Sequence, residues 1–407
     1  MGFSLHHHLA PMRHDYLVDS DPAKWGTRFH GFEVRSPTAI AQEDPSHTII
    51  VIYPFRSARQ VILTTLDAMG PYMALPPVEP FALRTFALRL ERGLDSGLVR
   101  KQPALNDHAI LVQGPLTEGI TESVMRYYAK RHSEEWLILS TWADSPAELI
   151  AQVEPFCDRL LLNVPPDHAG PGNRNMQLVS TRAGLEECAR LGLSKVIKTR
   201  TDALVSGDHI FSNSIALQAG TDASRCRALG MSGRILVTER YTLRYIPYHV
   251  SDILMFGDTE DLLRFWSVPL DPRRYDPMSS EWHGKTYREL SRERALAEIY
   301  FTRHFLDSLG WEASHTLEDH WTMLRDLFVV LDERWFGHCF PRYDSIPLDD
   351  GRNPDEADIL VDYAYWRHLQ EADMTAEAAG IDLDRIRYRH MWERRNLRGM
   401  DPRGNWP

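Results

Sequence analysis

Four short apolar runs decide the fold of this chain: Ala109-Ile-Leu-Val-Gln113, Trp136-Leu-Ile-Leu-Ser140, Arg159-Leu-Leu-Leu-Asn163 and Lys195-Val-Ile-Lys-Thr199. Their length and aliphatic content are typical of buried strands. The segments between them, 120–132, 146–155 and 176–191, have the apolar spacing of helices. Strands that alternate with helices in this way pair in parallel. The sequence therefore predicts an α/β fold with a mainly parallel sheet flanked by helices.

The rest of the chain divides into four segments that carry this pattern less regularly. Residues 1–45 are predicted to form an irregular leader, and residues 46–106 a strand–helix annex. Residues 107–205 hold the four runs, residues 206–345 form a second half, and residues 346–407 a helical C-terminal extension. Outside the four-run region we expect strands at 48–53, 234–238 and 252–256, helices at 56–69, 81–94, 258–266, 292–309 and 354–396, and an apolar run at 326–332.

The composition indicates a globular protein. Hydrophobic residues make up 43% of the chain and charged residues 25%. The net charge of -11 argues against a nucleic-acid binder, because such proteins carry a basic excess. No apolar run approaches the ~18 residues of a transmembrane helix, and the four cysteines are scattered, as in a reducing compartment. We expect a cytoplasmic protein, with docking at the inner face of a membrane left open.

Polar clusters follow the predicted strands. They are Gln113-Gly114-Pro115, Ser140-Thr141-Trp142, Asn163 and Arg200-Thr201-Asp202. In parallel sheets, ligands bind at the carboxyl ends of the strands. The coincidence predicts a binding site at that edge.

The strongest single pattern is Lys198-Thr-Arg-Thr-Asp202. In an extended chain Lys198, Arg200 and Asp202 share one face, and two cations beside a carboxylate suit a nucleotide diphosphate with its divalent metal. An ion cluster at a strand end is an equally good interpretation. The pattern offers one carboxylate, not the pair found in many nucleotide-sugar enzymes.

A loop and helix start at 170–184 offer further polar groups. The amides of Asn173, Asn175 and Gln177 suit recognition of a base or sugar, and Arg182 lies near a helix start that attracts anions. A surface loop that caps the helix is the alternative. The spacing of the glycines matches neither a dinucleotide fingerprint nor a P-loop.

Two acidic residues are candidates for a general base. Asp252 stands just before a predicted strand, and Glu298 lies among apolar neighbours on a predicted helix, where burial would raise its pKa. A turn cap for Asp252 and an ion pair for Glu298 are the ordinary alternatives. His315, Asp319 and His320 do not have the spacing of a zinc site, and we expect a structural role for them.

The order of these motifs resembles the WavE lipopolysaccharide-synthesis family, a bacterial family expected to hold glycosyltransferases. The resemblance covers residues 107–340 and is most specific over 110–202. It rests on Ile110-Leu-Val-Gln-Gly-Pro115, Ile138-Leu-Ser-Thr-Trp142, Gly172-Asn-Arg-Asn-Met-Gln177, Ser180-Thr-Arg-Ala-Gly-Leu185, Val196-Ile-Lys-Thr-Arg-Thr-Asp202, Ser251-Asp252 and Glu298-Ile-Tyr-Phe301.

The resemblance implies a GT-A-like fold that transfers a sugar from a nucleotide diphosphate sugar to a glycan or lipid-linked glycan. It implies that residues 107–205 bind the donor and residues 206–345 the acceptor. Asp202 would bind Mn²⁺ or Mg²⁺, or only a ribose hydroxyl. The donor-binding residues that it implies are Gln113, Gly114, Pro115, Ser140, Thr141, Trp142, Lys198, Arg200 and Asp202. The polar groups of the 170–184 segment add Asn175, Gln177 and Arg182 to the predicted donor-binding set.

Two other functions remain open from the sequence. A sugar nucleotidyltransferase needs a similar sheet, but the loop 114–119 after the first run has no arginine or lysine. A non-enzymatic glycan-binding protein would use some of the eleven tryptophans for stacking on sugars. Turnover of a nucleotide sugar separates a binder from both enzymes.

Overall fold

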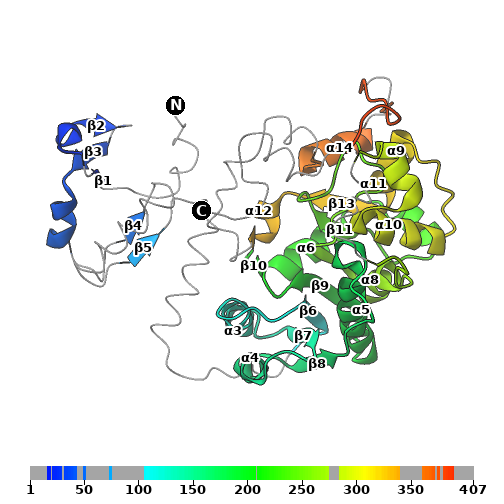
Figure 1. Cartoon of the computed structure of the whole chain (residues 1–407), viewed down its shortest axis with the longest axis horizontal. Helices are drawn as coiled ribbons and strands as arrows, with labels where there is room; N and C mark the ends of the chain where they lie inside the picture. Colours follow the sequence, from blue (N-terminus) through cyan, green and yellow to red (C-terminus); the bar gives the residue numbers. More distant parts are fainter. Residues whose placement is uncertain are drawn as a thin grey trace. The chain divides into compact units, whose positions relative to one another are not determined.

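The computed structural model describes residues 16–19, 21–29, 32–43, 49–51, 73–75, 105–207, 209–274, 284–339, 360–371, 374–375 and 379–388. The chain forms two compact units, residues 1–94 with 343–347 and residues 95–342 with 348–407 (Figure 1). The helices expected at 56–69 and 81–94 lie outside the described residues.

The N-terminal unit contains short strands. β3 (Phe32–Arg35) pairs with β1 (Leu17–Val18) on one side and with β2 (Arg28–Phe29) on the other. β4 (Ile49–Val51) pairs in parallel with β5 (Met73–Leu75). The strand expected at 48–53 is thus present, and the segment expected to be an irregular leader carries three short strands.

The second unit is built on a seven-stranded sheet in the order β13-β11-β12-β9-β6-β7-β8. Only β12 runs antiparallel to its neighbours, so the predicted mainly parallel sheet is confirmed. The strands are β6 (His108–Gln113), β7 (Trp136–Trp142), β8 (Arg159–Asn163), β9 (Lys195–Arg200), β11 (Ile235–Thr238), β12 (Met255–Asp258) and β13 (Phe328–Leu331).

Helices cover both faces of this sheet (Figure 1). On one face, α5 (Arg174–Arg190) packs on β6 with Gly184 against Leu111, where an added Cβ would lie 2.2 Å from a leucine methyl. On the other face, His108 of β6 stacks on Phe211 of α6 (Ile210–Ala219) at 5.3 Å. The other helices are α3 (Thr121–Arg131), α4 (Ala147–Val153), α7 (Ser224–Ala228), α8 (Thr259–Trp266), α9 (Tyr287–Glu293), α10 (Ala297–Ser308), α11 (Leu317–Leu327), α12 (Glu333–Phe336) and α14 (Tyr363–Glu371).

Two expectations for the second half need correction. The helix expected at 292–309 is two helices, α9 and α10, because Arg294 adopts a left-handed conformation with φ 50°. β12 begins at Met255, so Asp252 lies in the loop before the strand. In the C-terminal extension, which is expected to be largely helical, the described residues hold the helix α14.

The C-terminal helix protects one edge of the sheet. α14 packs on β13 and α11, and Trp366 donates its indole N–H to the carbonyls of Phe328 (2.9 Å) and Leu324 (3.2 Å). Burial of an aromatic side chain together with its polar atom anchors the helix at this edge. In the described part of the chain, no helix has the length and apolarity needed to cross a membrane.

Candidate functional site at the carboxyl edge of the sheet

The register of the sheet brings three strand ends together. Gln113 of β6 pairs with Ser140 of β7 on one side and with Arg200 of β9 on the other. Side chains at paired positions of parallel strands point to the same face. This face is the one covered by α5, because Ser180 of α5 donates to Gln113 Oε1 at 2.8 Å. The sheet thus places these predicted residues side by side.

A hydrogen-bond network fixes the side chains at this edge. Ser140 Oγ donates to the carbonyl of Ser180 at 2.6 Å, and Asn163 Nδ2 donates to Ser140 Oγ at 2.9 Å. Gln113 and Ser140 are buried, as are Thr141 and Trp142 beside them. These side chains therefore shape and stiffen the edge from below, while exposed Pro115 lies at its surface.

The turn after β6 is tied to the end of β9. Gly114 has φ 128°, a conformation that side chains rarely adopt, and an added Cβ would lie 3.0 Å from Thr201 Oγ1. Thr201 Oγ1 donates to the carbonyl of Pro115 at 2.7 Å, and its N–H donates to the carbonyl of Gln113 at 3.0 Å. Glycine is needed here so that the two strand ends can approach.

Lys198 is buried and does not reach the surface. Its Nζ donates to the carbonyl of Asp252 and lies 4.4 Å from the centre of the Trp266 ring of α8. Burial lowers the pKa of Lys198, while the neighbouring Asp252 acts in the opposite direction. Lys198 thus holds the Asp252 loop from beneath the edge.

Arg200 is the cation that reaches solvent. It makes a bidentate pair with Asp202, Nε to Oδ1 at 2.8 Å and Nη2 to Oδ2 at 2.9 Å. The side chain of Arg200 is 34% exposed and that of Asp202 is 8% exposed. Arginine in this forked geometry is well suited to phosphate oxygens.

This donor set does not fit a preformed divalent-metal site. Both carboxylate oxygens of Asp202 are engaged by Arg200. Among the described residues, no three histidine, cysteine, aspartate or glutamate side chains are grouped to hold an ion. Mg²⁺ and Mn²⁺ prefer several oxygen ligands. Metal binding by Asp202 stays a prediction, and no chemical step is derived through it.

The two candidate bases lie in one cluster with a histidine. Glu298, at the start of α10, has Oε2 3.6 Å from His249 Nε2, and its charge acts on Asp252. Burial raises the pKa of Asp252, and the charge of Glu298 reinforces this. Burial also raises the pKa of Glu298 and lowers that of His249 to about 4.

Sequence reasoning missed the contribution of the loop after β11. Tyr241 has φ 64°, which is strained for a bulky residue, and its side chain is 36% exposed. Its carbonyl accepts the Nδ1–H of His249 at 2.8 Å. Next to it, Arg240 forms a bidentate ion pair with Glu333 of α12. Strain and long-range pairing of this kind leave no local sequence signal.

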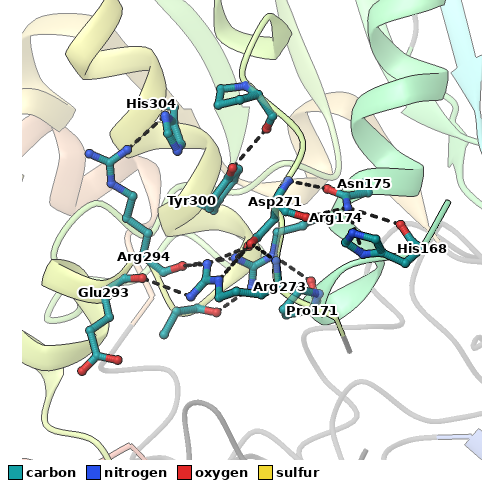
Figure 2. Close-up of polar contacts among 12 residues, drawn as sticks. His168, Pro171, Arg174, Asn175, Asp271, Arg273, Glu293, Arg294, Tyr300 and His304 are labelled. Atoms are coloured by element: carbon teal, nitrogen blue, oxygen red, sulfur yellow. Dashed lines mark hydrogen bonds and ion pairs between the residues drawn. The ribbon is translucent and has the colours of Figure 1, made fainter. Parts of the chain in front are cut away.

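A second polar cluster fixes the start of α5 (Figure 2). Fully buried Arg174 donates to Asp271 Oδ2 at 2.9 Å and to the carbonyls of Arg294 and Ala295 at 3.1 and 2.6 Å. The backbone N–H of Asp271 donates to Asn175 Oδ1 at 2.7 Å, and Asn175 Nδ2 donates to the backbone carbonyl of Asp271 at 2.9 Å. Both polar atoms of the Asn175 amide are thus engaged within the protein.

The remaining two predicted residues lie along α5. Gln177 is partly exposed near the helix start. Arg182 is 38% exposed and lies 3.8 Å from Glu186, one turn later on the same helix. The Arg182 guanidinium is therefore drawn toward an acidic neighbour on its own helix.

A model of the WavE lipopolysaccharide synthesis family matches residues 109–327, which is more than half of the chain. The chain belongs to the WavE family. A comparison with curated proteins finds no match. The family's description gives this WavE chain a role in lipopolysaccharide synthesis.

Part of the candidate site lies within the residues that the family model matches, and part lies after them. The carboxyl edge of β6, β7 and β9, the Asp252 loop and Glu298 all fall within the WavE region. Glu333 and His338, which pair with each other at 2.9 Å beside Arg240, come after its end. Strand β13 also follows the matched region, so the WavE sheet is completed by residues beyond the match.

Proposed function

We propose that this WavE-family chain is a glycosyltransferase that moves a sugar from a nucleotide diphosphate sugar to a glycan or lipid-linked glycan in lipopolysaccharide synthesis. One observation carries the proposal. A solvent-reaching arginine, Arg200, stands at the carboxyl edge of a parallel sheet in one electrostatic cluster with Asp252 and Glu298. Phosphate recognition and proton transfer are the two tasks that such a reaction requires of the protein.

The donor diphosphate would lie against Arg200, after this side chain exchanges Asp202 for phosphate oxygens. Lys198 beneath the edge adds positive potential in a region of low dielectric constant, where charge acts strongly. The turn at Gly114 and Pro115 would border the nucleotide, with Gln113, Ser140, Thr141 and Trp142 as the rigid wall below. Gln177 and Arg182 are proposed as peripheral contacts, and Asn175 as a residue that positions the loop.

The reaction itself needs a proton acceptor and a stabilised leaving group. A carboxylate, Asp252 or Glu298, takes the proton of an acceptor hydroxyl while that oxygen bonds to the anomeric carbon. The bond between the anomeric carbon and the diphosphate oxygen breaks, and the diphosphate leaves with the electron pair beside Arg200. Removal of a positioned general base costs about 10²–10⁴-fold in rate.

Turnover by the full chain tests this proposal. Purified protein is incubated with UDP-sugars and GDP-sugars and with a lipopolysaccharide or lipid-linked glycan fraction, and released nucleoside diphosphate is measured. We expect one donor class to be consumed. Replacing whichever of the two carboxylates is the proton acceptor, by Asp252→Asn or by Glu298→Gln, should abolish release.

The matched control is Asp261→Asn, which changes a buried carboxylate on α8 that binds the backbone N–H groups of Ser232 and Gly233. A folded wild type that turns over no donor with any acceptor fraction would contradict the proposed activity. Uptake of glycan without turnover would favour a glycan-binding protein, and sugar-1-phosphate-dependent release of pyrophosphate a nucleotidyltransferase.

A further inference from the structure

His249 and Glu298 are neighbours, and the proposed function does not say which of the two carries a proton. The Tyr241 carbonyl only accepts hydrogen bonds, so His249 Nδ1, 2.8 Å away, must carry a proton. In a neutral ring the lone pair of Nε2 therefore remains, and it faces Glu298 Oε2 at 3.6 Å. An ionised carboxylate facing this lone pair would be repelled.

One proton between the two groups removes the repulsion. It resides on Glu298, which leaves both groups neutral, or it resides on His249, which makes the contact an ion pair. The His249 side chain is 5% exposed and the Glu298 side chain 20% exposed. Burial disfavours both charges of an ion pair. The neutral arrangement, with the proton on the carboxyl, is the one that burial favours.

The charged groups around the pair do not reverse this balance. Burial raises the pKa of Glu298, and a hydrogen bond from its own backbone N–H and the charge of Arg174 of α5 act against this rise without reversing it. His249 feels the negative charge of Asp252, and His320 of α11 lies near enough for the two rings to influence each other. His320 Nε2–H donates to the carbonyl of Leu243, and Nδ1 accepts the N–H of Tyr248, so His320 is itself neutral.

Asp252 has different neighbours. Burial raises the pKa of the Asp252 carboxyl group to about 6, and the positive charges of Lys198 and Arg200 oppose this rise. The Nζ of Lys198 also binds the Asp252 carbonyl. Cations stabilise an ionised carboxylate. The two acidic groups of the site thus face opposite partners, a lone pair for Glu298 and cations for Asp252.

We propose that Glu298 carries a proton beside the neutral imidazole of His249, so that Asp252 alone is the proton acceptor of the site and His249 is a positioning residue. The assignment of Asp252 as acceptor rests on the proposed function. The protonation of Glu298 does not, because it is a property of the folded chain. Tyr241 takes part through its backbone, since its strained conformation aims the carbonyl that fixes the His249 tautomer.

Infrared spectroscopy of the full chain tests the proton placement without any substrate. At pH 8 ordinary carboxyl groups are ionised, so a carbonyl band from a protonated carboxylic acid stands out in difference spectra. We expect Glu298→Gln to remove such a band and Asp252→Asn to leave it. His249→Leu should shift it, because the polar imidazole beside the carboxyl group is lost, and His249→Gln should return it toward the wild-type position.

Two infrared results would overturn the proton placement. A band absent from the wild type, with His249 doubly protonated by ¹⁵N NMR, would put the proton on the imidazole. A band that Asp252→Asn removes would put it on the other carboxyl. Thermal melting checks that each variant is folded, and Glu298→Gln, an isostere of the neutral acid, is the variant least expected to unfold.

The activity arm separates this inference from the function on which it rests. Once a donor is identified, we expect kcat of Asp252→Asn to fall by about 10²–10⁴-fold, and kcat of Glu298→Gln to fall less than that of Asp252→Asn. Activity in Asp252→Asn together with an inactive Glu298→Gln would refute the assignment of the acceptor while leaving the glycosyltransferase proposal intact. A wild type without transfer activity would refute the proposed function, and the infrared result would still decide where the proton lies.

Discussion

Replacement of Arg174 by methionine should destabilise the second unit by about 3–5 kcal/mol, the range for removing one partner of a buried ion pair. The structure supports this range, because the Arg174 side chain is fully buried and binds Asp271, which is 1% exposed. The carbonyls of Pro171, Arg294 and Ala295 would also lose a donor. Asp271 keeps Arg273 as a partner at 2.6 Å, so we expect a value near 3 kcal/mol.

Urea unfolding followed by tryptophan fluorescence measures this effect as a fall in the midpoint at constant m-value. Arg182→Met is the matched control, because Arg182 is on the same helix and forms an exposed pair with Glu186. Its effect should stay within about 0.5 kcal/mol. The account of this cluster is wrong if the free energies of unfolding of Arg174→Met and Arg182→Met differ by less than about 1 kcal/mol, which is on the order of one hydrogen bond.

Three further predictions follow from buried groups elsewhere in the second unit. Gly184→Ala should cost about 1–3 kcal/mol by overpacking against Leu111, and Leu111→Ala in the same chain should show a less than additive cost. Burial lowers the pKa of His320 to about 4, so the stability that its neutral form provides is complete above pH 6.5 and is lost as the pH falls toward 4. This loss amounts to about 3 kcal/mol at ~1.4 kcal/mol per pH unit; it should be visible in urea midpoints at pH 7.5, 6, 5 and 4, and His320→Gln should flatten the profile. Because Arg200 engages both oxygens of Asp202, EDTA should leave nucleoside diphosphate affinity unchanged within about twofold, a difference of only ~0.4 kcal/mol; a tenfold loss would show that Asp202 binds a metal.

Much of the fold was predictable because its signals are local. The apolar runs at 109–113, 136–140, 159–163 and 195–199 fall within β6, β7, β8 and β9. Their order along the chain with intervening helices is sufficient to predict parallel pairing. The division of 292–309 into α9 and α10 was not predictable, because arginine has no local preference for the left-handed conformation that Arg294 adopts. Its backbone carbonyl accepts hydrogen bonds from Arg174 and Arg273, which are distant in the sequence.

The site was predictable to the extent that it lies at strand ends. Gln113, Ser140 and Arg200 meet because the pairing of parallel strands aligns their carboxyl ends. The partners of these residues come from distant parts of the chain. Glu298 contacts His249 across 49 positions, and Arg240 contacts Glu333 across 93, so spacing along the sequence carries no signal for either pair.

Calorimetric titration of nucleoside diphosphates tests the central claim most directly, which is that the exposed guanidinium of Arg200 marks a diphosphate site. UDP, GDP and ADP are titrated into three proteins: wild type, a double variant that combines Arg200→Met with Asp202→Asn, and the control Arg159→Met. The double variant avoids leaving the Asp202 carboxylate without its arginine partner. Arg159 is an exposed arginine at the amino end of β8 in the same sheet. The account predicts that one nucleotide binds wild type and Arg159→Met alike and binds the Arg200 variant at least tenfold more weakly, about 1.4 kcal/mol or more for lost charged hydrogen bonds. Equal affinity of all three proteins, or no binding to folded wild type, would contradict it.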